Sequence, residues 1–245
     1  MMSEPTQDRD RVLAEARVEY ERRDSVVARN GKPVRPEDMI IRVRTARQYA
    51  NALQACGLLP IGERAVLDVG CGDGNFLLRC RDEWGQQEAP LCGIDLMVNR
   101  IERLKRQASY LDVRAGSADQ LPWEDNTFDL VHQSMLLTSV LDESLRRGIA
   151  AEMRRVTRNG GHVLWYDFIW NPVNKAAVGL SLRRVRSCFP GWVVAHRRRT
   201  TLPPPIARRL LRISETLVAA VEALTIFNSF ELLLLRKPSE GESKP

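Results

Sequence analysis

The most informative stretch of the sequence reads Val66-Leu67-Asp68-Val69-Gly70-Cys71-Gly72-Asp73-Gly74. An apolar run opens it, glycines follow at alternate positions, and a new apolar run begins at Phe76. This order predicts a buried strand, a glycine turn and a helix. In open α/β sheets, ligands bind at the carboxyl ends of strands, where glycines let the backbone approach them. The stretch therefore predicts a ligand site at a strand-to-helix turn.

Segments of strand and helix character alternate on both sides of this turn. Strands are expected at residues 65–69, 91–95, 110–114, 128–132 and 163–168, with helices at 76–84, 98–107 and 142–157 between them. Asn159-Gly160-Gly161 is expected to end the last of these helices. The remainder suggests a helix at 176–188, a strand at 192–200, a proline break at 203–205, a helix to about 224 and a strand at 230–235. Strands that alternate with helices require crossover connections, and these are right-handed almost without exception. We therefore expect an α/β fold, a Rossmann-like doubly wound sheet of seven mostly parallel strands with helices on both faces.

The first 60 residues are expected to form an N-terminal helical cap. Its second helix shows apolar or long side chains at spacings of three and four, namely Ile40, Val43, Arg47, Ala50 and Leu53. Residues 61–238 would form the ligand-binding domain, and residues 239–245 a polar tail.

Composition excludes several classes of protein. The chain has 245 residues, of which 44% are hydrophobic and 28% charged, so it is neither disordered nor dependent on disulfides for a core. Its five cysteines contain no C-x-x-C pair, and its polar first ten residues are unlike a signal peptide, which favours a cytoplasmic location. Residues 217–235 are interrupted by Glu222, Asn228 and Glu231, so we expect no membrane span there. The oligomeric state is left open.

The positive charge is concentrated in the last third of the chain. The net charge is +6, and residues 171–245 hold 13 Lys and Arg against 5 Asp and Glu. Such a run is usually a solvated face, and its alternative is a surface for an anionic partner such as RNA, a phosphorylated substrate or lipid headgroups.

An acidic residue at the end of the second strand narrows the choice of ligand. Asp95 follows Gly74 by 21 residues, which suits a carboxylate that accepts hydrogen bonds from a ribose. The glycine spacing is G-x-G-x-G, whereas dinucleotide sites use G-x-G-x-x-G, and no Gly-Lys-Ser/Thr follows. Asp68 and Asp73 would repel a pyrophosphate. The pattern favours a cationic nucleoside.

Four motifs in register resemble those of class I S-adenosylmethionine-dependent methyltransferases, most closely the methyltransferase-11 type. They are Asp68-x-Gly70-x-Gly72-x-Gly74, Gly93-Ile94-Asp95, Gly116-Ser117-Ala118-Asp119-Gln120-Leu121-Pro122-Trp123 and Asn126-Thr127-Phe128-Asp129-Leu130-Val131. The resemblance spans residues 65–168 and implies S-adenosyl-L-methionine as cofactor.

The resemblance also implies roles for individual residues. The glycine turn would pass under the methionine portion, with Asp68 near its ammonium and Gln133 beside it. Asp95 would bind the ribose, Leu96 would pack on adenine, and the adenine edge would face Ser117 and Ala118. Relatives usually carry Asp where Ser117 stands, so the exocyclic amine could be bound by Ser117 or by Asp119 instead. The implied cofactor set is Asp68, Gly70, Cys71, Gly72, Gly74, Asp95, Leu96, Ser117, Ala118 and Gln133.

Two side chains are candidates for catalysis because they lie at the carboxyl ends of strands four and five. His132 is either a general base or a packed histidine, and Asp167 is a base, an orienting group or a helix cap. His162 and His196 are expected elsewhere. No acidic cluster suggests a metal site, so metal independence is predicted.

The sequence favours methyl transfer to a small molecule, such as a hydroxyl of a sugar, a polyketide or a lipid-linked intermediate. Nucleobase-amine methylation is disfavoured because His132-Gln133-Ser134-Met135 stands where such enzymes carry a Pro-Pro motif. An RNA methyltransferase that uses the arginine-rich third is the first alternative, and a non-catalytic cofactor-binding scaffold is the second.

Overall fold

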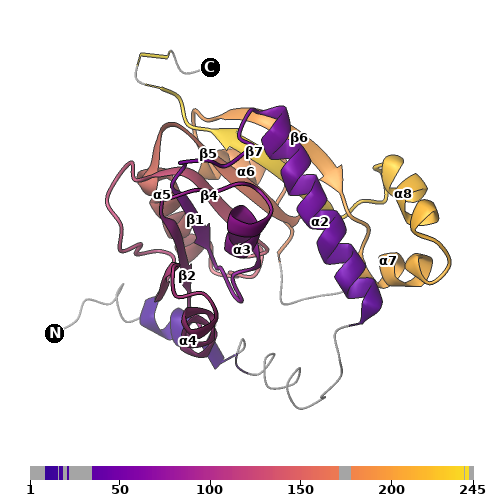
Figure 1. Cartoon of the computed structure of the whole chain (residues 1–245), viewed down its shortest axis with the longest axis horizontal. Coiled ribbons are helices and arrows are strands. Elements are labelled where there is room, and N and C mark those ends of the chain that lie inside the picture. The colour runs from indigo at the N-terminus through magenta and orange to yellow at the C-terminus, as the bar shows by residue number, and fades with distance from the viewer. Residues whose placement is uncertain are drawn as a thin grey trace.

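The structure is a computed structural model that describes residues 9–15, 17, 18, 21, 35–170, 178–239, 241 and 242. Its centre is a seven-stranded sheet in the order β3-β2-β1-β4-β5-β7-β6 (Figure 1). The strands from β1 to β5 pair in parallel, and β7 runs antiparallel to both of its neighbours. The strands are β1 (Val66–Val69), β2 (Leu91–Asp95), β3 (Asp112–Ala115), β4 (Phe128–Ser134), β5 (Thr157–Phe168), β6 (Val193–Thr200) and β7 (Phe230–Arg236).

Helices cover both faces of this sheet. Side chains from α2, α3 and α4 share one core cluster with Leu164 and Tyr166, and side chains from α5 and α6 share another with Val163 and Trp165. The helices are α2 (Pro36–Ala55), α3 (Asn75–Asp82), α4 (Val98–Gln107), α5 (Glu143–Val156), α6 (Leu182–Cys188), α7 (Pro204–Leu211) and α8 (Glu215–Ala223). Successive residues of β5 face opposite layers, as strand geometry requires. The predicted Rossmann-like, doubly wound fold is confirmed.

The order of the strands places a switch point beside the first glycine turn. β1 pairs with β2 on one side and with β4 on the other. The chain therefore first winds outward to β3 and then returns across β1 to build the other half. Ligands of open α/β sheets bind outside the carboxyl ends of the strands at such a point.

The buried face of α2 differs from the predicted one. Its buried residues are Ala46, Tyr49, Ala52 and Leu53, whereas Val43 is exposed. This face packs in the core cluster that also contains Phe76 and Tyr166, and the helix further contacts α7 and β7. Ala52 and Leu53 belong to the main core cluster, so this part of the predicted cap packs directly on the domain.

Two predicted boundaries in the middle of the sheet are wrong. β4 continues to Ser134, so Gln133 lies inside the strand and not past its end. β5 begins at Thr157, directly after α5, and its Gly160 and Gly161 bond to the backbone of Lys237. The glycines therefore lie in the first part of β5, and the helix ends before them.

The prolines at 203–205 begin a helix, although a break was predicted. Pro204 and Pro205 occupy the first turn of α7, where a missing N–H costs no helical hydrogen bond. The predicted single helix to residue 224 is two helices, α7 and α8.

Several predicted features lie wholly or partly outside the described residues. These are most of residues 7–34, the start of the helix expected at 176–188, and most of the polar tail. The described arginines of the last third are divided between layers, since α6 packs with α5 whereas α7 packs with α2 and α8. No helix of the described residues is long and apolar enough to cross a membrane.

Candidate active site

A glycine bend, residues 70–74, follows β1 at the switch point. Gly70, Gly72 and Gly74 have φ values of +77°, +53° and +75°, a left-handed conformation that side-chain-bearing residues rarely adopt. The bend is tied to β2, since the backbone N–H groups of Gly70 and Cys71 both donate to the carbonyl of Ile94. The predicted glycine turn and the end of β2 are thus brought together.

Asp95 closes the bend from the side of β2. Its Oδ2 accepts a hydrogen bond of 2.9 Å from the N–H of Gly72, and its Oδ1 accepts one of 2.9 Å from Met97. Burial raises the pKa of this carboxyl group, although both backbone bonds and the charge of Arg100 oppose that effect. The same carboxylate therefore shapes the bend, and its binding of a ribose stays a prediction.

The thiol of Cys71 is not a nucleophile in this site. It is buried, and burial, together with the charges of Asp68 and Asp95, raises its pKa far above the ordinary value. Cys71 therefore contributes to the predicted cofactor site through its backbone, which forms part of the bend.

The predicted adenine edge lies after β2 and β3. Leu96, Ser117 and Ala118 are all half-buried. The hydroxyl of Ser117 donates to Asp119, and Asp119 also accepts a 2.6 Å hydrogen bond from Nε of Arg9. The two alternative partners for the exocyclic amine are therefore linked to each other and to the N-terminal segment.

Asp68 and His132 form a buried pair on neighbouring strands. Nδ1 of His132 lies 2.7 Å from Oδ1 of Asp68, and both residues are buried. The register of β1 with β4 sets them side by side. Asp68 therefore points at the histidine within the sheet. Nε2 of His132 is buried and has no hydrogen-bond partner among the described residues.

Two aromatic residues that the sequence analysis missed hold His132 in place. The ring of Phe76 stacks on the imidazole with 3.7 Å between centroids, and Tyr49 meets it edge-on at 5.3 Å. The Tyr49 hydroxyl donates to Ser134 Oγ at the end of β4. Phe76 belongs to the predicted helix, but no sequence signal connects Tyr49 of α2 to this strand.

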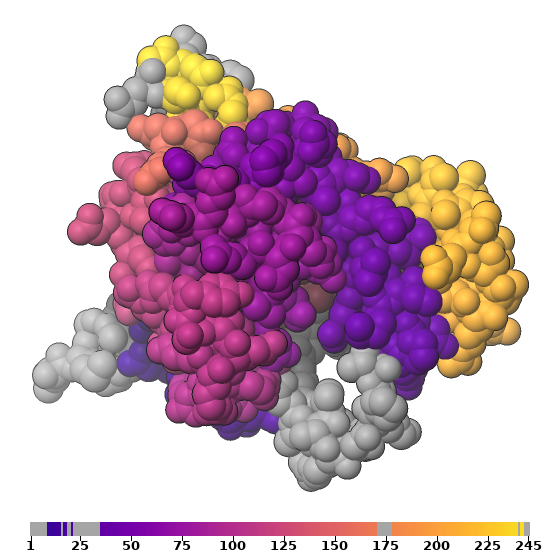
Figure 2. All heavy atoms as spheres, viewed as in Figure 1, coloured from indigo at the N-terminus to yellow at the C-terminus, as the bar shows by residue number. Residues whose placement is uncertain are grey.

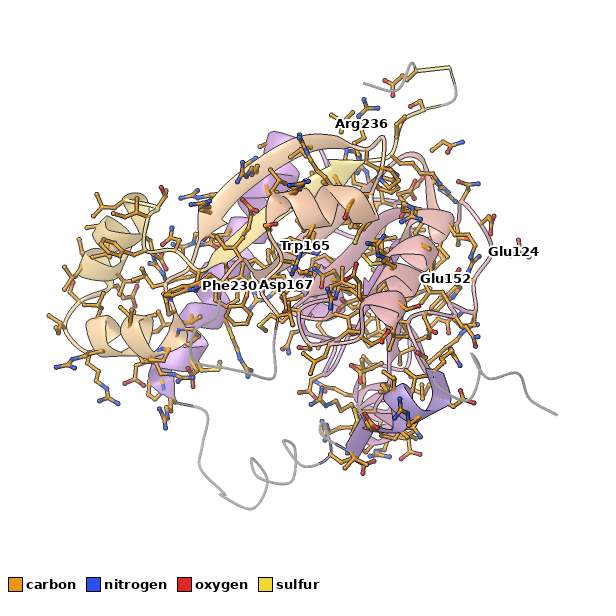
Figure 3. The ribbon with its side chains drawn as sticks, turned by 180° about the vertical axis from the view of Figure 1, so that it is seen from behind. Glu124, Glu152, Trp165, Asp167, Phe230 and Arg236 are labelled. Carbon is orange, nitrogen blue, oxygen red and sulfur yellow. The ribbon has the colours of Figure 1, made fainter. Side chains whose placement is uncertain are left out.

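Asp167 lies on the other face of the sheet from His132. Its carboxylate accepts hydrogen bonds from the hydroxyl and the N–H of Thr138 and from the N–H of Phe168. Complete burial raises its pKa to about 7 against these bonds. Figure 3 shows it beside Trp165 on the side of α5 and α6. The structure does not bring the two catalytic candidates together, and the contacts of Asp167 tie the loop after β4 to β5.

Gln133 shares this second face and also supports the loop after β4. Its Oε1 accepts a 3.2 Å hydrogen bond from the N–H of Leu136, and a hydrogen bond from its side chain helps to lower the pKa of Asp167 against the effect of burial. Leu136 lies 3.3 Å from the position that a Cβ on Gly70 would take, so this loop packs on the glycine bend. Gln133 thus supports the loop that borders the predicted methionine position.

The residues present fit a nucleoside cofactor at the bend. A Cβ on Gly72 would meet only Arg100 within 4 Å, so the backbone there is open to a ligand. Asp95 retains further lone pairs for hydroxyl groups, because a carboxylate offers about four acceptor sites. The buried Nε2 atom of His132 has no hydrogen-bond partner among the described residues. The individual roles in the predicted cofactor set stay predictions.

Part of the chain is similar in sequence to known methyltransferases. Residues 66–161 match the family model described as a methyltransferase domain. A demethylmenaquinone methyltransferase of Renibacterium salmoninarum is 30% identical over 131 residues, which are 54% of this chain and 52% of that protein. One of Bacillus licheniformis is 33% identical over 109 residues, 43% of this chain and 45% of its own. The chain thus spans about half the length of the curated relatives it matches.

Solved structures show the same fold at low sequence identity. An S-adenosylmethionine-dependent methyltransferase from Mesorhizobium loti has a TM-score of 0.56 and 16% identity, with 76% of this chain and 98% of that chain covered. The [4+2]-cyclase SpnF has a TM-score of 0.58 and 18% identity, with 79% and 80% covered. The chain therefore has the class I methyltransferase fold.

Residues 66–161 match the methyltransferase-domain family, and the chain has the fold of class I S-adenosylmethionine-dependent methyltransferases. S-adenosylmethionine is the methyl donor of this family, and its predicted use is confirmed at that level. Because the fold also occurs in a protein named as a cyclase, the fold alone does not determine the reaction, which depends on the side chains of the site.

Proposed function

We propose that this chain transfers the methyl group of S-adenosylmethionine to a small-molecule acceptor whose reacting atom gives up a proton to His132. The observation that carries the proposal is the hydrogen-bonded pair of Asp68 and His132, in which Asp68 lies two residues before the glycine bend. The Nε2 atom of His132 has no hydrogen-bond partner among the described residues. The names of the relatives favour the lipid-linked acceptor among the three classes that the sequence leaves open.

The proposed division of labour follows from these contacts. The cofactor supplies an activated methyl group on a sulfonium. The acceptor atom forms a bond to the methyl carbon as the sulfur–carbon bond breaks. Its proton passes to Nε2 of His132, while Asp68 accepts the hydrogen bond from Nδ1–H and stabilises the resulting positive charge. Phe76 and Tyr49 keep the imidazole in one orientation, and alignment of the reactants supplies much of the rate.

The catalytic part of the proposal is tested with His132→Asn. Asparagine can still donate to Asp68 but has no atom at the place of Nε2. Isotopically labelled S-adenosylmethionine is incubated with the chain and with a lipid extract, an aqueous metabolite extract or RNA. We expect the label in a lipid product by mass spectrometry, and a turnover about 10²–10⁴-fold lower for the variant. His196→Asn on β6 is the matched control and should retain full turnover.

The cofactor assignment has its own measurement. Isothermal titration with S-adenosylhomocysteine should show about tenfold weaker binding for Asp95→Ala, since a hydrogen bond to a charged group contributes about 1.5–3 kcal/mol. Asp125→Ala, which removes an exposed carboxylate paired with Arg155, should bind normally. Equal affinity in both variants would refute the ribose role. Binding without transfer to any of the three pools would instead favour the scaffold, and label in RNA the nucleic-acid alternative.

A further inference from the structure

Large apolar side chains are exposed on α7, on α8 and in the turns beside them. Fourteen such side chains are exposed among the described residues, and six of them lie between positions 206 and 227. Three arginines lie among these six. We call this the α7–α8 surface, and its members are Ile206, Arg208, Arg209, Arg212, Ile213, Leu217, Leu224, Ile226 and Phe227.

The packing of the two helices explains why these side chains face outward. Ala207 of α7 and Val218 of α8 are buried together with Leu202 in a small cluster that also touches Ile41 of α2. The opposite faces of both helices are therefore turned to solvent. α7 and α8 stand at the margin of the molecule, beyond α2 (Figures 1 and 2). Ile213 and Ile226 are 71% and 73% exposed, so neither side chain contributes to the core.

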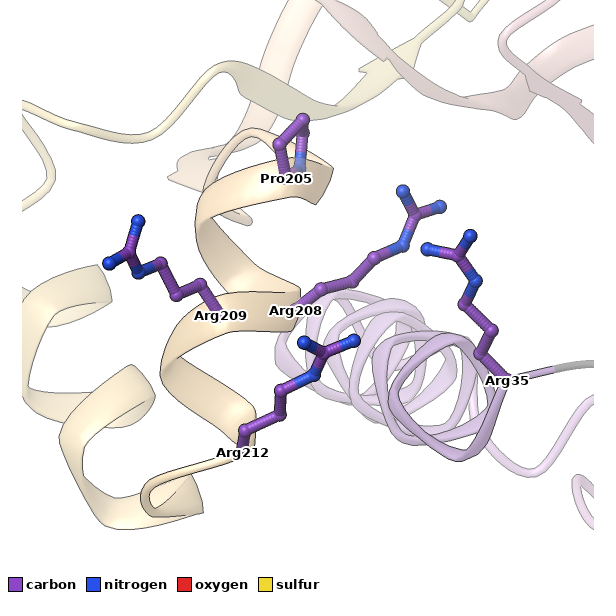
Figure 4. Close-up of a pocket in the computed structure, with 5 residues that line it drawn as sticks. All are labelled: Arg35, Pro205, Arg208, Arg209 and Arg212. Atoms are coloured by element: carbon purple, nitrogen blue, oxygen red, sulfur yellow. The ribbon is translucent and has the colours of Figure 1, made fainter.

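The arginines give this surface a positive charge. They line a cavity of about 520 Å³ together with Arg35 and Pro205 (Figure 4). Arg208 and Arg212 pair with Asp38 and Glu37 of α2. Arg209 has no ion pair within the described part of the chain, and the hollow is lined by four arginines, two of which are paired with the carboxylates of Asp38 and Glu37. Glu215, at the start of α8, is an exposed carboxylate nearby in the sequence. Anionic groups are therefore attracted to this hollow.

Apolar and basic side chains share one face of α7. Ile206 and Arg209 are three positions apart on α7, so they are neighbours on the helix surface, and Ile213 follows in the turn after the helix. A helix with this mixture lies in the interfacial region of a bilayer, where the apolar side chains enter the acyl boundary and the basic ones contact lipid phosphates. Basic residues near an anionic leaflet add attraction that salt screens.

We propose that the α7–α8 surface binds the face of an anionic lipid bilayer. The arginine-lined hollow would hold lipid phosphates, and Ile213, Ile226 and Phe227 would enter the interface. A soluble phosphate or an RNA would gain from the arginines but not from these exposed apolar side chains. The inference goes beyond the proposed function and does not depend on it.

The test measures binding to lipid vesicles by co-sedimentation. We expect the chain to bind vesicles that contain phosphatidylglycerol, to release them as salt is raised, and to bind pure phosphatidylcholine vesicles weakly. The double variant Ile226→Ser/Phe227→Ser should bind at least about tenfold more weakly, because two apolar side chains no longer leave water. Arg209→Gln should bind about fivefold more weakly, which corresponds to about 1 kcal/mol per basic residue.

Matched controls lie on α4, away from this surface. Val98→Ser removes an exposed apolar side chain, and Arg106→Gln removes the same charge as Arg209→Gln. Both should bind vesicles as the unaltered chain does. S-adenosylhomocysteine titration verifies that every variant is folded, so a loss of vesicle binding is not a loss of structure.

Four results would overturn the proposal. The chain could fail to bind anionic vesicles, or the α4 controls could weaken binding as much as the α7–α8 variants do. Heparin or inorganic phosphate could bind as tightly, without dependence on Ile226 and Phe227, which would make the hollow a site for soluble anions. Sedimentation velocity could show a dimer that the double variant abolishes, which would assign the surface to a second copy.

Discussion

A Cβ atom on Gly74 would lie 2.6 Å from Cδ1 of Leu104, and the backbone there has a φ of +75°. Two separate costs therefore meet at one residue, the left-handed conformation and the clash with α4. Gly57 has a similar φ of +68° with nothing within 4 Å of a Cβ. The pair allows the two costs to be separated.

We expect Gly57→Ala to lower the free energy of unfolding by about 1–2 kcal/mol, the cost of the left-handed conformation. Gly74→Ala should lower it by a further 1–3 kcal/mol or so, because Leu104 and α4 have to move. Urea denaturation of both variants measures the difference. Equal losses would mean that α4 accommodates the methyl group freely.

His162 provides a pH dependence at the level of one residue. Burial, with the positive charges of Arg236 and Arg64, lowers the pKa of His162 to about 4. The unfolded chain binds a proton near pH 6.5, so between pH 6.5 and 4 it holds more protons than the native state. Stability therefore rises with pH in this window and is lost as the pH falls.

The variant His162→Asn should reduce this slope. Urea midpoints measured between pH 6.5 and 4 should depend less on pH than those of the unaltered chain. His196→Asn should change the slope less, because that imidazole is more exposed. An unchanged slope in His162→Asn would show that other groups cause the acid sensitivity.

At the scale of elements, α2 is joined to α8 by one partly buried ion pair. Nη2 of Arg44 lies 2.5 Å from Oε2 of Glu222, and the side chains are 22% and 12% exposed. Glu222 also accepts a long hydrogen bond from the N–H of Leu202. The pair therefore helps to hold α8 and the strand-to-helix connection against α2.

Glu222→Gln should loosen α7 and α8 without opening the sheet. Loss of a charged hydrogen bond costs about 1.5–3 kcal/mol, so amide exchange in both helices should speed up by about ten- to hundredfold. Exchange in β1 and β4 should stay as it is. Glu215→Gln, at the exposed start of α8, is the control, and an equal effect there would rule out the ion pair as the cause.

At the scale of the whole molecule, the candidate site is built from several elements of one sheet. The glycine bend bonds to β2, the loop after β4 packs on the bend, and α2 covers the end of β4. A ligand that binds this site binds the folded chain alone. Its binding free energy therefore adds to the stability of the fold.

S-adenosylhomocysteine at about 100 times its Kd should raise the free energy of unfolding by about 2.7 kcal/mol. The same concentration should stabilise Asp95→Ala less. The nicotinamide dinucleotide NAD is the control ligand, because the bend lacks the dinucleotide spacing. Equal stabilisation by NAD, measured by urea denaturation, would contradict a site selective for S-adenosylhomocysteine.

Local patterns were sufficient to predict the elements of the sheet. β2 and α4 have the bounds that the sequence predicts, because a short buried run and a charged amphipathic run are each complete within ten residues. The alternation of such runs also predicts the mainly parallel sheet. The glycine bend and Asp95 were placed together for the same reason, since parallel strands end at one edge.

Contacts across the sheet were not predictable in this way. Asp68 and His132 are 64 positions apart, and only the register of β1 with β4 pairs them. The buried face of α2 depends on distant segments, since Tyr49 packs against Phe76 of α3, His132 of β4 and Tyr166 of β5. Asp167 and His132 lie in adjacent strands yet face opposite layers, because side chains alternate along a strand. The local elements follow from the sequence alone, because they depend on residue types and their spacing. The partner of each side chain depends on which distant segment packs against it, and that is settled only in the folded chain.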